Sequence, residues 1–189
     1  MLSVAGIEHD YQWIDIFAER SDRPEEFQKH ARYHEVPLLL NDGQAYVQSG
    51  AILLHLAKHH GQYGGETPER LARCAEWLMW EANKIGMCLP QLRAKHRFND
   101  TSINAGAFEW LSARYHHDVH LLNNVLVSGQ DWVLSGDNPT IADFSLCGYL
   151  FLAHEADVSV PKGVSAWLER IRQLPGWADH HSLLSEKSI

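Results

Sequence analysis

Two pairs of histidines are spaced so that each pair would share one face of a helix. His116 and His120 are four residues apart, and so are His55 and His59. Such pairs can ligate a metal ion, but a metal site also needs a third ligand and supporting hydrogen bonds. A solvated, histidine-rich helix face is the commoner arrangement, and we therefore expect no metal.

Three cysteines could supply thiol chemistry: Cys74, Cys88 and Cys147. An odd number this small does not make a disulfide framework. None lies at a glycine-rich turn between a strand and a helix, so each is expected to be a small buried apolar residue rather than a catalytic thiol. The sequence also lacks a phosphate-binding loop, a dinucleotide-binding glycine turn, an HExxH motif and a Ser-His-Asp signature.

Three tryptophans recur at helical spacing: Trp77, Trp80 and Trp110. They either belong to the core of a helical region, which is the commoner role, or line a hydrophobic pocket for a small molecule.

The composition excludes several functional classes. The chain has 189 residues, of which 45% are hydrophobic and 21% charged, as in ordinary globular proteins. A net charge of −8 provides no electrostatic attraction for nucleic acid or for an anionic membrane. We find no apolar run long enough to span a membrane and no signal peptide, and we expect a cytoplasmic protein.

Residues 1–62 have the pattern of a mixed α/β domain. The expected elements are a strand at 11–17, a helix at 23–31, strands at 36–40 and 45–48, and a helix at 50–58. Aromatic or β-branched residues alternate with polar ones from Tyr11 to Phe17, which is typical of a half-buried strand. The segment Asn41-Asp42-Gly43 is a turn signal that predicts a hairpin, and Ser49 is the expected N-cap of the helix that follows.

Residues 67–189 have helical patterns throughout and form a second predicted domain, after a breaker-rich linker at 62–68. The expected helices cover 68–83, 104–127, 141–154 and 162–173. The helix at 141–154 is apolar nearly all round, which predicts a buried position in the middle of the helical domain. Thr140 and Asp143 lie three residues apart at its start and predict a capping box.

A Val-Pro opens the hairpin, a Gln-Ser pair opens the next helix, and the capped apolar helix follows. With these features in this order, the sequence resembles the cytosolic glutathione S-transferases. The matching segments are Glu35-Val-Pro-Leu-Leu39, Gln48-Ser-Gly-Ala-Ile52, Ser135-Gly-Asp-Asn-Pro-Thr-Ile-Ala-Asp-Phe-Ser145 and Trp167-Leu-Glu-Arg-Ile-Arg-Gln-Leu-Pro175. The resemblance implies a thioredoxin-like N-terminal domain, an all-α C-terminal domain and a homodimer.

The resemblance also implies a glutathione site at Val36, Pro37, Gln48 and Ser49, with glutathione as a co-substrate. In the family the Val-Pro bond is cis, and the backbone of Val36 would pair with the cysteinyl part of glutathione like an added strand. Free amides and the positive dipole end at the start of the helix suit the γ-glutamyl carboxylate, which Ser49 would help to hold.

The sequence departs from the family pattern at two places. Glu35 stands where the family often has Lys, Gln or Arg, and its charge is wrong for the glycine carboxylate; His34 is a candidate for that role. Met1–Gly6 resembles only the end of the family's first helix, so we expect the first strand and the residue that activates the glutathione thiol to be missing from this chain. The strands at 11–17 and 36–40 would then each have an unpaired edge, in a sheet that closes differently, borrows a strand or stays partly loose.

Two functions remain open at this point. The first is a transferase that, in its full-length form, adds the glutathione thiolate to a small hydrophobic electrophile. The second is a non-catalytic binding or assembly module of the same fold. A turnover assay with a chloro-nitroaromatic compound separates the two.

Overall fold

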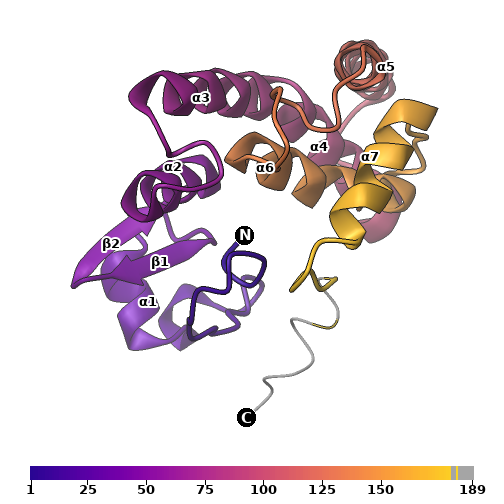
Figure 1. The fold of residues 1–189 in the computed structure, drawn as a ribbon. Coiled ribbons are helices and arrows are strands. Elements are labelled where there is room, and N and C mark those ends of the chain that lie inside the picture. Colours follow the sequence, from indigo (N-terminus) through magenta and orange to yellow (C-terminus); the bar gives the residue numbers. More distant parts are fainter. Residues whose placement is uncertain (180–181, 183–189) are drawn as a thin grey trace.

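The structure is a computed structural model that describes residues 1–179 and 182. Figure 1 shows a β-hairpin with a short helix in one part and a larger group of helices in the other. The helix α2 (Ser49–His60) lies between them and contacts both the hairpin and two helices of the larger group. This is the architecture expected from the sequence, a thioredoxin-like region followed by an all-α region; the domain boundaries themselves stay a prediction.

The strands β1 (Leu38–Asn41) and β2 (Gln44–Val47) form an antiparallel hairpin in which Leu38 pairs with Val47. The two loop residues, Asp42 and Gly43, both have positive φ angles, of 50° and 73°. Such a turn has a twist that matches the paired strands, and Asp-Gly is among the sequences that adopt it most readily. The predicted hairpin is therefore confirmed.

The segment at 11–17 is not a strand, and that prediction is wrong. A strand needs a neighbour whose backbone groups complete its hydrogen bonds. Across the described residues the only ladder is the one between β1 and β2, so this segment has no such neighbour and β1 has one open edge. The alternating side chains, expected to be half-buried, include Trp13 at 55% exposure and Phe17 at 82%.

Two short helical elements lead from this segment to the hairpin: η1 (Arg20–Asp22) and α1 (Glu25–His30). Two glutamates in the first turn of α1 favour its positive dipole end, and Phe27 is its buried anchor. The predicted helix at 23–31 is thus confirmed.

Helix α2 ends at His60 and is followed by Gly61, whose φ of 62° lies in the left-handed region that favours glycine after a helix. Gly65 lies so close to the carbonyl of Ala57 that no side chain would fit there. This close approach turns the linker back against α2. A small buried cluster then joins α2 to the helical part: Ala57, Cys74, Leu78 and Ile141.

Between residues 68 and 179 the structure has five α-helices and a short 3-10 helix: α3 (Pro68–Asn83), α4 (Ile85–Phe98), α5 (Ala105–Val127), α6 (Ile141–Leu150), η2 (Ala153–Ala156) and α7 (Lys162–Arg172). Side-chain caps fix the starts of two of them. The hydroxyl of Thr67 accepts from the amide of Arg70 at 3.1 Å, and the side chain of Asn104 accepts from the amide of Ala107 at 2.8 Å. The helices predicted around 68–83, 104–127 and 162–173 are confirmed within a residue or two.

Helix α4 was not predicted as a separate element. Pro90 lies inside it, and a proline within a helical pattern normally indicates an end or a kink. The helix is separated from α3 only by Lys84, whose φ and ψ of −121° and −92° are not helical. Burial of one face of α4, including Leu89 and Leu92, compensates for the hydrogen bond that the proline removes.

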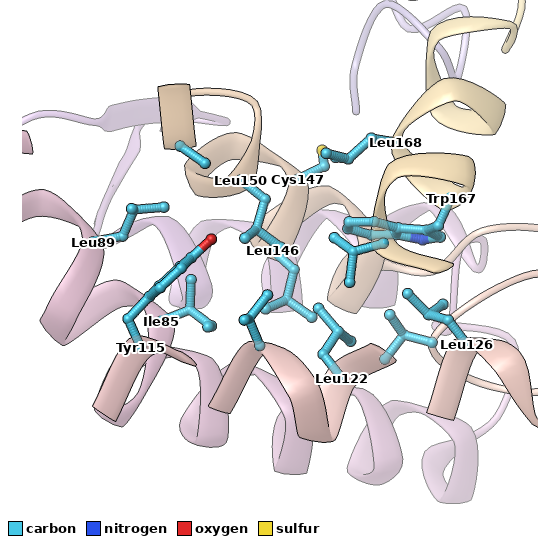
Figure 2. Packing of buried hydrophobic residues seen from close by; sticks show 14 of the residues in the cluster. Ile85, Leu89, Tyr115, Leu122, Leu126, Leu146, Cys147, Leu150, Trp167 and Leu168 are labelled. Atoms are coloured by element: carbon cyan, nitrogen blue, oxygen red, sulfur yellow. The ribbon is translucent and has the colours of Figure 1, made fainter. Parts of the chain in front are cut away.

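The largest core surrounds α6, as predicted from its apolar character. Figure 2 shows Leu146 and Leu150 of α6 among residues from α4, α5 and α7, with Trp167 closing one end. The predicted capping box is confirmed, because the Asp143 carboxylate accepts from the backbone amide of Thr140 at 2.7 Å and the Thr140 hydroxyl accepts from the backbone amide of Asp143. The Thr140 hydroxyl also lies 3.0 Å from the same carboxylate and donates to it. The same carboxylate also accepts from the Trp167 indole and from the amide of Val133, both at 2.9 Å.

None of the helices in residues 1–179 has both the length and the apolar character that crossing a membrane requires.

Candidate functional site

The Val36-Pro37 peptide bond, immediately before β1, is cis, as the family resemblance implied. Val36 is 47% exposed, and no described residue forms a hydrogen bond with its backbone. Its amide and carbonyl are therefore free to pair with an extended peptide laid beside them.

The N-terminus of α2 lies at the same end of the hairpin. Gln48 occupies the N-cap position, with a φ of 73°, and Ser49 is the first helical residue. The expectation that Ser49 is the N-cap is therefore wrong by one position: positive φ at Gln48 turns the chain directly from β2 into the helix. No side chain in the described part of the chain caps the first turn, so its amides remain available to a ligand.

The four predicted site residues are brought together by the hairpin register. Because Leu38 pairs with Val47, Pro37 and Gln48 flank the last pair of the ladder. The side-chain amide of Gln48 donates to the carboxylate of Glu35 at 3.2 Å, which joins the segment before β1 to the start of α2. An extended backbone and a positively polarised helix start thus lie side by side.

Arg23 holds together the backbone segments beside this site, and the sequence analysis did not identify it. Its guanidinium donates to the carbonyl of Ile16 at 2.7 Å, to that of Ala18 at 3.2 Å and to that of His34 at 2.8 Å. One side chain thereby ties the irregular segment before η1 to the residues that precede the cis bond. No local pattern could have indicated this role, because the acceptors are backbone carbonyls placed by the course of the chain.

A shallow hollow opens between these residues, lined by Ile16, Arg23, His34, Glu35 and Val36. Glu35 is exposed and presents a negative charge, while the hydrogen bonds of Arg23 to carbonyls direct its positive charge partly inward. His34, the candidate for holding the glycine carboxylate, lines the hollow with a φ of 58°. The role itself stays a prediction.

The three cysteines are buried and free, as predicted. Burial raises the pKa of Cys74, Cys88 and Cys147, in the last case to about 12. A thiol with a raised pKa and little or no solvent contact is a poor nucleophile. Catalytic thiol chemistry by this chain's own cysteines is therefore not supported.

The histidine pairs do not assemble a larger ligand set. In the described part of the chain, no group of three or more histidine, cysteine, aspartate or glutamate side chains could hold a metal ion. His55 instead stacks on Tyr46, with ring centroids 3.8 Å apart, and hydrogen-bonds to the side chain of Asn41 at 2.7 Å.

Two of the three tryptophans belong to the helical core, and the third is exposed. Trp77 and Trp80 pack against the helical core and against each other, with ring centroids 5.2 Å apart. Trp110 is 54% exposed, with the guanidinium of Arg114 5.5 Å from its ring centroid. None of the three lines the hollow beside Val36.

Comparison with known proteins agrees with this geometry. Residues 1–59 match the family model described as the glutathione S-transferase N-terminal domain. Human glutathione S-transferase A3 is 30% identical over 184 residues, which cover 93% of this chain and 77% of that protein. The chain belongs to the glutathione S-transferase family.

Of two further similar proteins, one is named as an oxidoreductase and the other as a transferase. The disulfide-bond oxidoreductase YfcG of Escherichia coli is 29% identical over 183 residues, covering 89% of this chain and 81% of that protein. The crystal structure of a glutathione S-transferase from Xanthobacter autotrophicus superimposes with a TM-score of 0.80 at 26% identity, covering 98% of this chain and 91% of that one.

Proposed function

We propose that Val36, Pro37, Gln48 and Ser49 bind glutathione. The observation that carries this proposal is the hydrogen bond from Gln48 to Glu35, which holds the free backbone of Val36 beside the first turn of α2. The cysteinyl part of glutathione pairs with that backbone, and the γ-glutamyl carboxylate lies at the helix start.

Isothermal titration with glutathione and with cysteinylglycine tests this binding mode. Cysteinylglycine lacks the γ-glutamyl carboxylate, so we expect it to bind at least about tenfold more weakly. Equal affinity for the two peptides would place the carboxylate elsewhere.

We further propose that the bound glutathione is used as a nucleophile towards a small hydrophobic electrophile. Its thiolate forms a carbon–sulfur bond, a leaving group such as chloride departs with the electrons of the broken bond, and the thiol proton passes to solvent. No side chain of this chain is assigned to activating the thiol. Turnover of 1-chloro-2,4-dinitrobenzene above the rate of free glutathione supports the transferase; binding without turnover supports a non-catalytic module instead.

Thiol–disulfide exchange is a second candidate, favoured by the 29% identity to the oxidoreductase YfcG. One glutathione thiolate attacks a disulfide and releases one thiol, and a second glutathione resolves the mixed disulfide to give oxidised glutathione and the other thiol. Because the protein's own cysteines are buried, both electrons come from glutathione. Formation of oxidised glutathione from 2-hydroxyethyl disulfide measures this reaction separately.

We also propose that the chain acts in the cytoplasm as a homodimer, the arrangement that the family resemblance implies. Sedimentation velocity at several protein concentrations tests the oligomeric state.

A further inference from the structure

Two exposed phenyl rings are in contact, and one of them belongs to the residue that follows Ile16, which lines the hollow of the proposed glutathione site. Phe17 comes from the irregular segment before η1, and Phe98 is the last residue of α4. Their ring centroids are 6.3 Å apart at an angle of 58°, and their side chains are 82% and 52% exposed. Exposed aromatic rings in contact form an open apolar surface on which another planar ring can stack.

Positive charge borders this surface. The guanidinium carbons of Arg93 and Arg97 lie 5.3 and 5.6 Å from the ring centroid of Phe98. Both face one carboxylate: the Nε of Arg93 lies 2.6 Å from an oxygen of Glu155, and the Nε of Arg97 lies 3.9 Å from the same oxygen.

One carboxylate cannot neutralise two guanidinium groups. Partial burial acts to raise the pKa of Glu155, but the hydrogen bond from Arg93 and the charges of both arginines hold it below its usual value, so the carboxylate is ionised. The trio keeps one net positive charge, and Arg97, 59% exposed and beyond hydrogen-bond distance of Glu155, presents that charge to solvent. In a chain of net charge −8, this positive charge at the Phe98 side of the surface favours an anionic ligand there; the carboxylate of Asp15, which accepts from the amide of Phe17 at 2.9 Å, is on the Phe17 side.

The chain connects the aromatic surface directly to the hollow of the proposed site. Ile16 lines that hollow together with Glu35 and Val36, and Phe17 is the next residue. Because Arg23 holds the carbonyls of both Ile16 and His34, the position of Phe17 is tied to the segment that carries Val36.

We infer that Phe17, Phe98 and Arg97 bind the second substrate, and that this substrate is a small aromatic electrophile carrying a carboxylate or sulfonate group. The ring stacks against the two phenyl groups, and the anion pairs with the guanidinium of Arg97. The inference rests on the proposed function, because it names the partner of the glutathione thiol.

Titrations without glutathione test the site itself. The probes are 4-chloro-3-nitrobenzoate and its neutral isostere 4-chloro-3-nitrobenzamide. We expect the wild-type protein to bind the benzoate about tenfold more tightly, as for a charge-assisted pair. Raising the salt from about 20 mM to about 500 mM should weaken benzoate binding and leave benzamide binding unchanged.

Two variants separate the charge from the stacking. Arg97→Gln should abolish the preference for benzoate while leaving benzamide affinity unchanged. Phe17→Ala should weaken both ligands by about threefold, because it removes aromatic contact and no charge. The exposure of both side chains keeps these changes away from the core.

Arg172→Gln is the matched control. Arg172 also lies over a phenyl ring, 4.9 Å from the centroid of Phe151, and also pairs with a glutamate, Glu169, at 3.3 Å. It belongs to α7, and its replacement should leave both affinities unchanged. The inference is overturned if wild type binds the two probes equally, or if Arg97→Gln retains the preference.

Glutathione affinity is measured in a separate titration, so the two proposals fail in distinguishable ways. Absence of glutathione binding overturns the proposed function and with it the substrate role, while the benzoate titrations still decide whether the anion site exists. With both sites present, Arg97→Gln should lower kcat/KM for the benzoate about tenfold and leave kcat/KM for the benzamide unchanged.

Discussion

The side-chain amide of Gln48 donates to the carboxylate of Glu35 at 3.2 Å, across the open end of the hairpin. This contact joins two segments that each have an ordinary local structure, a strand start and a helix start. Together they present the features that an extended peptide with a terminal carboxylate requires.

Ser49→Ala should weaken glutathione binding by about tenfold, because the hydroxyl at the helix start is lost from the carboxylate contact. The fold should be unaffected, since Ser49 is exposed and does not cap the helix. Titration calorimetry measures the change, and Ser165→Ala, in the first turn of α7, is the control. Unchanged affinity would remove Ser49 from the site.

Glu35→Gln should strengthen glutathione binding by about threefold, because it removes a negative charge next to a ligand that carries two carboxylates. The gain should shrink as salt screens the repulsion, so affinities at low and high ionic strength provide the check. A loss of affinity that persists at high salt would instead show that the Glu35 carboxylate contacts the ligand favourably.

Asp143→Asn should lower the free energy of unfolding by about 3 kcal/mol. The donors around Asp143 use both oxygens of its carboxylate, whereas the amide of asparagine has only one acceptor oxygen. Those donors are Val133, Thr140 and Trp167, and the site is fully buried. Urea denaturation followed by circular dichroism measures the loss. Asp137→Asn changes an exposed aspartate nearby and should have almost no effect.

Glu81 should make stability fall as the pH rises above about 4.5. The residue is 3% exposed; one carboxylate oxygen accepts from Ser145 at 2.7 Å, and the other has no hydrogen-bond partner among residues 1–179. Burial raises the pKa of Glu81, so above the ordinary pKa the unfolded chain ionises while the folded chain holds its proton.

The change in unfolding free energy caused by Glu81→Gln should therefore be more favourable at about pH 8 than at about pH 5. The difference should be about 1.4 kcal/mol for each unit by which the pKa of Glu81 differs between the folded and unfolded states. Urea midpoints at the two pH values check the sign. Glu69→Gln, an exposed glutamate of α3, should show no such difference. If Glu81→Gln and the wild type lost the same stability between the two pH values, the pH dependence would not come from Glu81.

Thiol reagents should not titrate the native protein. Cys74, Cys88 and Cys147 are buried and their pKa values are raised, so reaction with 5,5′-dithiobis(2-nitrobenzoate) at neutral pH should be slow until denaturant is added. Rapid reaction of a native thiol would reopen a direct redox role for the chain.

The sequence determined the features that depend on neighbouring residues. Asp42-Gly43 specifies the hairpin turn through two positive φ angles, and the Thr140–Asp143 spacing specifies the capping box of α6. These signals are short-range because the groups that satisfy each other lie within a few residues. Together with the family resemblance, such short motifs indicated the hairpin, the helix after it and the positions of Val36 and Gln48.

Only the tertiary structure decided the features that depend on distant partners. The alternation at 11–17 suits a strand, but a strand also needs a neighbour, and pairing is a property of the whole fold. Pro90 lies within α4 because burial of that helix outweighs the missing hydrogen bond. The carbonyls gathered by Arg23, and the meeting of Phe17 with Phe98 beside Arg97, likewise join segments whose separation in the chain leaves no local signal.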